Sequence, residues 1–252
     1  MAGRRCSHGM AGARGDKRSR GTGVSDDAAR MLRALEGSVG LRNPRSLCFA
    51  LPLGPGDRLL VVGSSPEVVR SARGLGVETM SLITPAQSEA SPLGGDVVIV
   101  DSGQAVPLAD EWADHLIIPA LRMSQRYLLA REMHRIVRPG GHLFLAARAR
   151  WYAPRDKAAL TLRHGRRLLQ AAGFAVVEQY AIRPGLHNPR HLVPATSNEA
   201  LRWYVERAYL PLNVSGLLRA RFLRRIPSRT MALTLFPALG LRARRVERQV
   251  AR

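Results

Sequence analysis

The sequence predicts an α/β protein built on a parallel β-sheet with helices on both faces. Short apolar runs that suit buried strands alternate with segments whose apolar residues recur at helical spacing. Glycines and prolines separate these segments, as they do where strands and helices end. The chain has 252 residues, 46% of them hydrophobic, which is enough to bury the core of such a domain.

The first half of the sheet is predicted from residue 55 onward. The sequence PGDRLLVVG indicates a turn and then a buried strand over residues 59–62, ended by a glycine. A helix over 66–73 follows, and it begins with a proline, whose missing N–H has no consequence in a first turn. Apolar runs at 77–83 and 96–101 predict the second and third strands.

The second half repeats this alternation. A strand over 114–118 precedes a helical apolar stripe at 128–136, the turn sequence RPGG and a fifth strand at 142–146. The sequence GRRLLQAAGFAVVEQ, at 165–179, predicts another helix, a turn and a sixth strand. A last strand at 240–246 completes seven strands, and strands that alternate with helices favour parallel pairing.

The residues that follow the first three strands are the candidate binding residues. In an open parallel sheet the ligand lies at the carboxyl ends of the strands, which here lead into 63–67, 84–86 and 101–103. Gly63 allows close approach of the backbone to a ligand, and Asp101 can accept a hydrogen bond from an exocyclic amine. Each also suits a plain structural role, as a turn glycine and as a capping aspartate.

Four stretches together resemble a class I S-adenosylmethionine-dependent methyltransferase of type 11. PGDRLLVVG is similar to the first strand and glycine loop of that family, and EMHRIVRPGGHLFLAAR resembles its helix, turn and fifth strand. DSGQAVPLADEWADHLII resembles the stretch in which Asp101, a Val-Pro pair and Asp114 recur at this spacing. With the stretch at 165–179, the resemblance covers about residues 53–182, half of the chain.

The resemblance implies a Rossmann-like fold with an antiparallel last strand and S-adenosylmethionine as the cofactor. The family's glycine loop normally begins with an acidic residue, but Val61 stands here, and Ser65 and Glu67 replace two glycines. An acidic residue normally holds the ribose after the second strand, where this chain has the neutral Thr84. The residues expected to bind the cofactor are Gly63, Ser64, Ser65, Thr84, Asp101, Ser102 and Ile118.

The reaction implied by the resemblance is methyl transfer to a hydroxyl or amine of a small-molecule, glycan or lipid-linked acceptor. The cofactor supplies the reactive methyl group, so the protein needs at most a base. Candidate bases are His115, His187 and His191, although surface or capping histidines are more common. No metal-ligand cluster, Walker loop or Ser/His/Asp order indicates another reaction.

Four regions are expected along the chain. Residues 1–23 form a disordered basic tail, with Met10 as an alternative start, and 24–184 form the methyltransferase-like core, opened by a helix capped at Ser25. Residues 185–238 form a helical insertion, and 239–252 form the last strand and a basic tail.

Two helices are predicted within the insertion. The sequence TSNE has capping-box spacing, with Thr196 as the cap, and an amphipathic basic helix follows at 215–225. Trp203, Tyr204 and Tyr209 are candidates for an acceptor pocket, but Tyr204 suits the core better.

The net charge of +20 comes largely from the two ends of the chain. Residues 1–30 carry seven basic and three acidic side chains, and 201–252 carry twelve and two. Anionic membrane surfaces and nucleic acid are candidate partners, but nothing resembles an RNA-binding module, so an RNA-modifying or RNA-binding protein ranks third among the functions considered. The runner-up to the methyltransferase is a methyltransferase-like binding protein without turnover.

No apolar run is long enough to span a bilayer, and two distant cysteines suit a cytoplasmic location.

Overall fold

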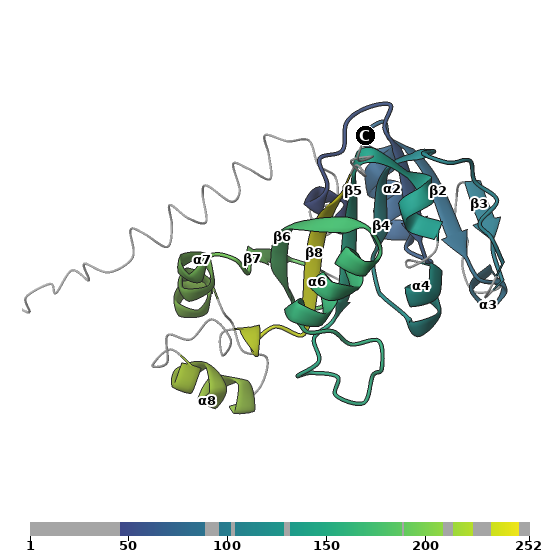
Figure 1. Cartoon of the computed structure of the whole chain (residues 1–252). Coiled ribbons are helices and arrows are strands. Elements are labelled where there is room, and N and C mark those ends of the chain that lie inside the picture. The colour runs from purple at the N-terminus through teal and green to yellow at the C-terminus, as the bar shows by residue number, and fades with distance from the viewer. Residues whose placement is uncertain are drawn as a thin grey trace, which may run out of the picture. The chain divides into compact units, whose positions relative to one another are not determined.

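The structure is a computed structural model that describes residues 46–88, 96–101, 104–128, 132–187, 189–208, 214–223 and 233–246. These residues form an eight-stranded sheet in the order β3-β2-β1-β4-β5-β8-β6-β7 (Figure 1). The pairs from β3 to β5 are parallel, β8 runs antiparallel between β5 and β6, and β7 is antiparallel to β6. The predicted fold class is confirmed, with one strand more than the seven expected.

The strands of the parallel half follow the predicted apolar runs. They are β1 (Arg58–Val62), β2 (Glu78–Ile83), β3 (Asp96–Ile99) and β4 (Ala113–Ile118). In β1 and β4 almost every residue is buried, because these strands lie in the middle of the sheet with both faces covered.

Helices cover both faces of the sheet. Helix α2 (Pro66–Arg73), whose bounds match the prediction, packs into one hydrophobic cluster with Leu59 of β1. Helix α6 (Leu162–Ala171) packs into the other cluster with the next residue, Leu60. Successive residues of β1 enter different cores because side chains alternate between the two faces of a strand. The other elements before β5 are η1 (Leu47–Ala50), α3 (Pro85–Ser88), α4 (Met123–Leu128) and α5 (His134–Ile136).

Strand β5 (Val137–Arg148) is longer than predicted, because the sequence RPGG lies within the strand and not in a turn. The pairing with β4 is interrupted between Val137 and His142, so the motif forms a bulge. Gly140 has a φ of +75°, and a Cβ on Gly141 would lie 2.7 Å from a backbone carbonyl oxygen of β4. The bulge therefore requires both glycines.

Arg135 fixes the loop between β3 and β4 at the start of β5. Its guanidinium donates to the carbonyl oxygens of Val106 and Leu108, at 3.0 and 2.6 Å. It also pairs with the carboxylates of Asp110 and Glu132, both at 2.7 Å. The hydrogen bond to Asp110 and, to a smaller extent, the one to Glu132 raise the pKa of Arg135 above its ordinary value. The stretch that contains Val106 and Pro107 is therefore held in place by one arginine next to β5.

The segment between β6 (Phe174–Arg183) and β8 (Ala238–Arg245) contains one strand that was not predicted. It holds β7 (His191–Pro194), α7 (Asn198–Trp203), the π-helical turn η3 (Tyr204–Ala208) and α8 (Val214–Leu223). The cap of α7 is Ser197, whose hydroxyl accepts from the N–H of Ala200, so the prediction of Thr196 was wrong by one residue.

Tyr204 belongs to the core of this segment and not to a binding pocket. Its ring lies between His191 and Phe236, with ring centroids 5.3 and 5.2 Å away, and only 3% of the residue is exposed. Trp203 is exposed. The prediction that Tyr204 is a core residue is therefore confirmed.

Several predictions fall on parts of the chain outside the described residues. They concern the tail at 1–23, the helix beginning at Ser25, Tyr209, the end of the basic helix at 224–225 and the basic tail after residue 246. Among the residues that the structure describes, no helix is long and apolar enough to cross a membrane.

Candidate active site

Four neighbouring parallel strands end at the same edge of the sheet, which we call the carboxyl edge; the opposite one is the amino edge. Strands β3, β2, β1 and β4 lie side by side in that order, so the residues that follow them come together at the carboxyl edge (Figure 1). The structure brings six of the predicted cofactor residues to this edge, and Ser102 lies outside the described residues. The six are Gly63, Ser64, Ser65, Thr84, Asp101 and Ile118.

The first turn leads from β1 into α2. Gly63 has a φ of +106°, which favours glycine, and its N–H donates to the carbonyl oxygen of Leu82, 2.8 Å away. Ser64 is exposed. Ser65 occupies the cap position of α2, but its hydroxyl makes no capping hydrogen bond with that helix. The turn thus presents two hydroxyl groups at the edge of the sheet.

Gln125 of α4 covers the first turn, and no feature of the sequence singled it out. Its side chain is buried, with Nε2 donating to the carbonyl oxygen of Val62 at 3.3 Å and Oε1 accepting from the N–H of Arg122 at 2.8 Å. A Cβ on Gly63 would lie 3.0 Å from Nε2 of Gln125. The glycine therefore meets a requirement of the chain itself and does not by itself indicate a ligand.

The remaining predicted residues differ in how accessible they are. Thr84 is half-buried, and its N–H donates to Oε1 of Gln87 at 3.1 Å. Asp101 is exposed, and its carbonyl oxygen accepts from the N–H of Gln104 at 3.2 Å. Ile118 is completely buried in the core. Asp101 is thus the accessible carboxylate of this set.

The polar groups of the carboxyl edge suit S-adenosylmethionine in kind. Hydroxyls of Ser64, Ser65 and Thr84 can form hydrogen bonds with ribose and carboxylate oxygens, and Asp101 can accept one from an amine. A neutral Thr84 makes weaker hydrogen bonds to ribose hydroxyls than a carboxylate would. The set fits the cofactor with fewer charged contacts than the family pattern has.

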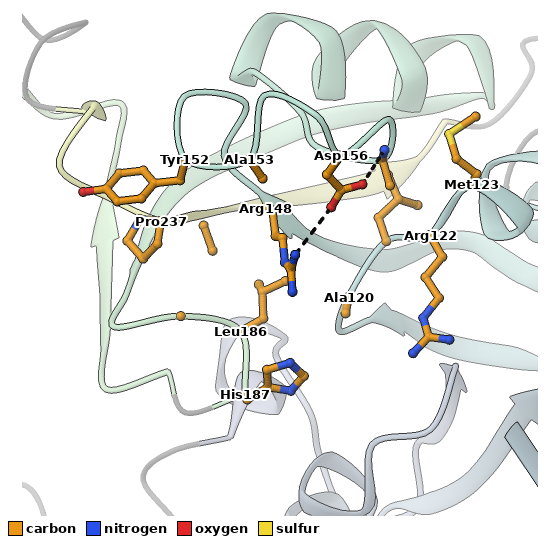
Figure 2. A pocket seen from close by; sticks show the side chains of 14 residues that line it. Ala120, Arg122, Met123, Arg148, Tyr152, Ala153, Asp156, Leu186, His187 and Pro237 are labelled. Carbon is orange, nitrogen blue, oxygen red and sulfur yellow. Dashed lines mark hydrogen bonds and ion pairs between the residues drawn. The ribbon is translucent and has the colours of Figure 1, made fainter. Parts of the chain in front are cut away.

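A cavity of about 600 Å³ opens at the same edge, farther along the sheet (Figure 2). We call it the edge cavity. It lies where β4 and β5 end, β8 begins, and the loops after β5 and β6 pass over the sheet. The residues that line it are Ala120, Leu121, Arg122, Met123, Arg148, Tyr152, Ala153, Asp156, Ala158, Gly185, Leu186, His187, Pro237 and Ala238. None of the predicted cofactor residues lines it, although Ile118 ends the strand that leads into it.

The loop after β5 is held over the edge cavity by hydrogen bonds within the loop and to the segment before β8. Oδ1 of Asp156 accepts from the N–H of Ala158 at 2.9 Å, and the hydroxyl of Tyr152 donates to the carbonyl oxygen of Leu235 at 3.0 Å. Arg148 lies 3.9 Å from Oδ2 of Asp156, a distance at which the ion pair is loose (Figure 2). The cavity wall is thus ordered and polar on this side.

The three histidines proposed as bases lie in different places. His115 is buried near the amino edge, with Nε2 3.2 Å from Oδ2 of Asp57, and burial lowers its pKa although Asp57 opposes the shift. His191 packs against Tyr204, and burial lowers its pKa too. His187 is exposed and lines the edge cavity. Of the three, His187 is the one placed to act at that cavity.

Sequence reasoning missed three polar residues of the edge cavity. Arg122 follows β4, Arg148 is the last residue of β5 and Asp156 follows it, but the predicted fifth strand ended two residues before Arg148. A fifth strand predicted to end at Arg148 would have made this residue a candidate, because ligands lie at the carboxyl ends of the strands.

Comparisons with known proteins bear on the fold. No protein-family model matches the sequence, and no curated protein matches it. Among solved structures, the chain is similar to one from the complex of the Haloferax volcanii Trm112 methyltransferase activator with a proposed methyltransferase. The identity is 14% and the TM-score 0.50, over 88% of this chain and 95% of that one.

Two further solved structures have lower TM-scores. An S-adenosylmethionine-dependent methyltransferase from Mesorhizobium loti has 15% identity and a TM-score of 0.47, over 79% of this chain and 95% of that one. Geranyl diphosphate methyltransferase, solved with geranyl diphosphate and sinefungin, has 16% identity and a TM-score of 0.48, over 79% and 75%. Together with the strand order, the Haloferax volcanii likeness shows that this chain has the class I methyltransferase fold.

Proposed function

We propose that the chain is an S-adenosylmethionine-dependent methyltransferase whose acceptor is a small molecule, or the glycan or lipid-linked equivalent, bound in the edge cavity. The observation that carries the proposal is the arrangement of the carboxyl edge. Residues chemically suited to the cofactor follow β1, β2 and β3, and a cavity large enough for a small molecule adjoins the end of β4.

The chain's own part in the reaction is mainly to bind and orient. When bound, the cofactor supplies an electrophilic methyl group. Asp101 would accept a hydrogen bond from the adenine amine, and Ser64, Ser65 and Thr84 would bind the ribose and the amino-acid end. The apolar lining of the edge cavity would contact the apolar part of the acceptor. His187 and Asp156 are the lining groups that can take the acceptor's proton.

Calorimetric titration with S-adenosylmethionine and S-adenosylhomocysteine tests this proposal. We expect binding on the order of micromolar, weakened about tenfold by Asp101→Ala. Asp96→Ala is the matched control, since it removes an exposed carboxylate at the amino end of β3. No heat and no thermal stabilisation at millimolar ligand, or equal weakening by both variants, would contradict it.

The second candidate is a methyltransferase-like binding protein without turnover. It is favoured by Gln125, which lies against Gly63 where the family places cofactor. This candidate predicts that the wild-type chain binds neither form of the cofactor and that Gln125→Ala, which opens the first turn, creates binding. The methyltransferase proposal predicts binding by the wild-type chain.

A further inference from the structure

Two arginines and a histidine face the edge cavity from three separate segments. Arg122 follows β4, Arg148 ends β5 and His187 follows β6. Figure 2 shows Arg148 above an open space, the side chain of Arg122 along its right and the imidazole of His187 on its left. Residues far apart in the sequence thus bring hydrogen-bond donors to one place.

The positive charge at this place is not neutralised by the cavity wall. Asp156 is the carboxylate among the lining residues, so two guanidinium groups and one carboxylate leave one positive charge. Asp156 already accepts from the N–H of Ala158, and its contact with Arg148 is 3.9 Å long. Within the described part of the chain, the guanidinium of Arg122 makes no hydrogen bond or ion pair.

The rest of the cavity wall is apolar. Leu121, Met123, Leu186, Pro237 and several alanines provide this surface. A ligand that matches the cavity therefore has a compact apolar part and an anionic group. Two guanidinium groups suit an oxyanion, because each can donate two parallel hydrogen bonds to its oxygens.

We propose that the edge cavity binds an oxyanion, a phosphate or carboxylate group, through Arg122 and Arg148, and that the methyl acceptor carries this group. The second half of the proposal rests on the proposed function, but the oxyanion site does not. Held by its anionic end, the acceptor presents its hydroxyl or amine toward the end of β4, on the side of the cofactor residues. His187 supplies a further hydrogen bond to the same ligand.

Anion titration tests the oxyanion site. Inorganic phosphate, pyrophosphate and acetate are titrated at constant ionic strength into the wild-type protein and into a double variant, Arg122→Gln with Arg148→Gln. We expect phosphate, pyrophosphate or acetate to bind the wild-type protein and the double variant to bind at least about tenfold more weakly. Tighter binding of phosphate than of acetate identifies the anionic group of the natural ligand as a phosphate. Tighter binding of acetate identifies it as a carboxylate.

The matched control is the double variant Arg166→Gln with Arg167→Gln, which removes the same charge from exposed positions of α6. It should bind like the wild-type protein, and Arg122→Lys with Arg148→Lys should keep part of the affinity. The proposal is overturned if none of the three anions binds the wild-type protein, or if the control loses as much affinity as the cavity variant.

Parallel titration with S-adenosylhomocysteine separates this inference from the proposed function. Cofactor binding without anion binding rejects the oxyanion site and leaves the methyltransferase proposal intact. Anion binding without cofactor binding supports the site but rejects its assignment to a methyl acceptor. Thermal unfolding of each variant confirms that it is folded before its affinity is compared.

Discussion

Arginines at the two edges of the sheet differ in what they contact. At the amino edge Arg58 pairs with Glu78, Arg138 pairs with Asp114, and Arg135 joins two carboxylates and two carbonyl oxygens. At the carboxyl edge Arg122 has no partner in the described chain, and Arg148 has a loose one. These three amino-edge arginines therefore stabilise the fold, whereas Arg122 and Arg148 at the edge cavity are available to a ligand. Other arginines near the carboxyl edge do bind the chain: Arg150, for example, donates to the carbonyl oxygen of Asp156 at 2.9 Å.

A similar difference separates one glycine of the β5 bulge from one glycine of the edge cavity. A Cβ on Gly141, in the bulge of β5 near the amino edge, would lie within 3.0 Å of two carbonyl oxygens. A Cβ on Gly185, in the lining of the edge cavity, would meet no atom within 4 Å among the described residues. The bulge is filled by the chain, and the edge cavity leaves space.

The largest effect that tests this comparison is expected at Arg135. Arg135→Met leaves carbonyl oxygens and carboxylates without their donor, and should lower the free energy of unfolding by about 3 kcal/mol. Arg148→Met should change it by less than about 0.5 kcal/mol, because its ion pair is exposed and long. Urea denaturation measures both. Equal effects would show that the two edges do not differ in this way.

A smaller effect is expected from adding one methyl group at each edge. Gly141→Ala should lower the free energy of unfolding by about 2 kcal/mol, because backbone atoms of β4 and β5 would have to move. Gly185→Ala should leave it nearly unchanged. A shift in the thermal midpoint for the second variant as large as for the first would contradict the account.

The smallest effect is a dependence of stability on pH that comes from His115 near the amino edge. Burial lowers its pKa below the ordinary 6.5, against the opposing effects of Asp57 and Asp114 and with a small contribution from Arg138. The unfolded chain therefore takes up the proton first, so this contribution to stability is full above about pH 6.5 and is lost as pH falls through the folded-state pKa.

Thermal unfolding measured from about pH 7.5 to about pH 5.5 checks this sign. His115→Phe should lose less stability on acidification than the wild-type protein. Some dependence of stability on pH should remain in this variant, because burial also lowers the pKa of His142, whose ring stacks on that of His115 in the wild-type protein. A variant that loses as much stability as the wild-type protein would exclude His115 as a cause.

The sequence predicted the sheet well where local patterns decide the structure. Strands β1, β2 and β4 and helix α2 are marked by buried apolar runs that end at glycine or proline. Strand β7 has four residues and a half-exposed pattern, which local periodicity does not distinguish from a loop. The bulge at RPGG depends on pairing with β4, which no local pattern reveals.

The candidate site was predictable only in part, for a related reason. Gly63, Thr84 and Asp101 could be placed at the carboxyl edge because the first two directly follow a predicted strand and the third ends one. Gln125 was missed because its contact with Val62 joins residues 63 positions apart in the sequence. Arg122, Arg148 and His187 were not predicted as a set, because only the folded sheet brings their three segments together.

The decisive measurement is amide hydrogen exchange with and without S-adenosylhomocysteine. It tests whether the ligand binds at the carboxyl edge and leaves the amino edge, which stabilises the fold, unchanged. The account predicts slower exchange in the turn at 63–65, at Thr84 and at Asp101 when the ligand is present. Exchange around Arg135 and the bulge of β5 should stay the same. Protection absent from the carboxyl edge, or equal at both edges, would contradict the account.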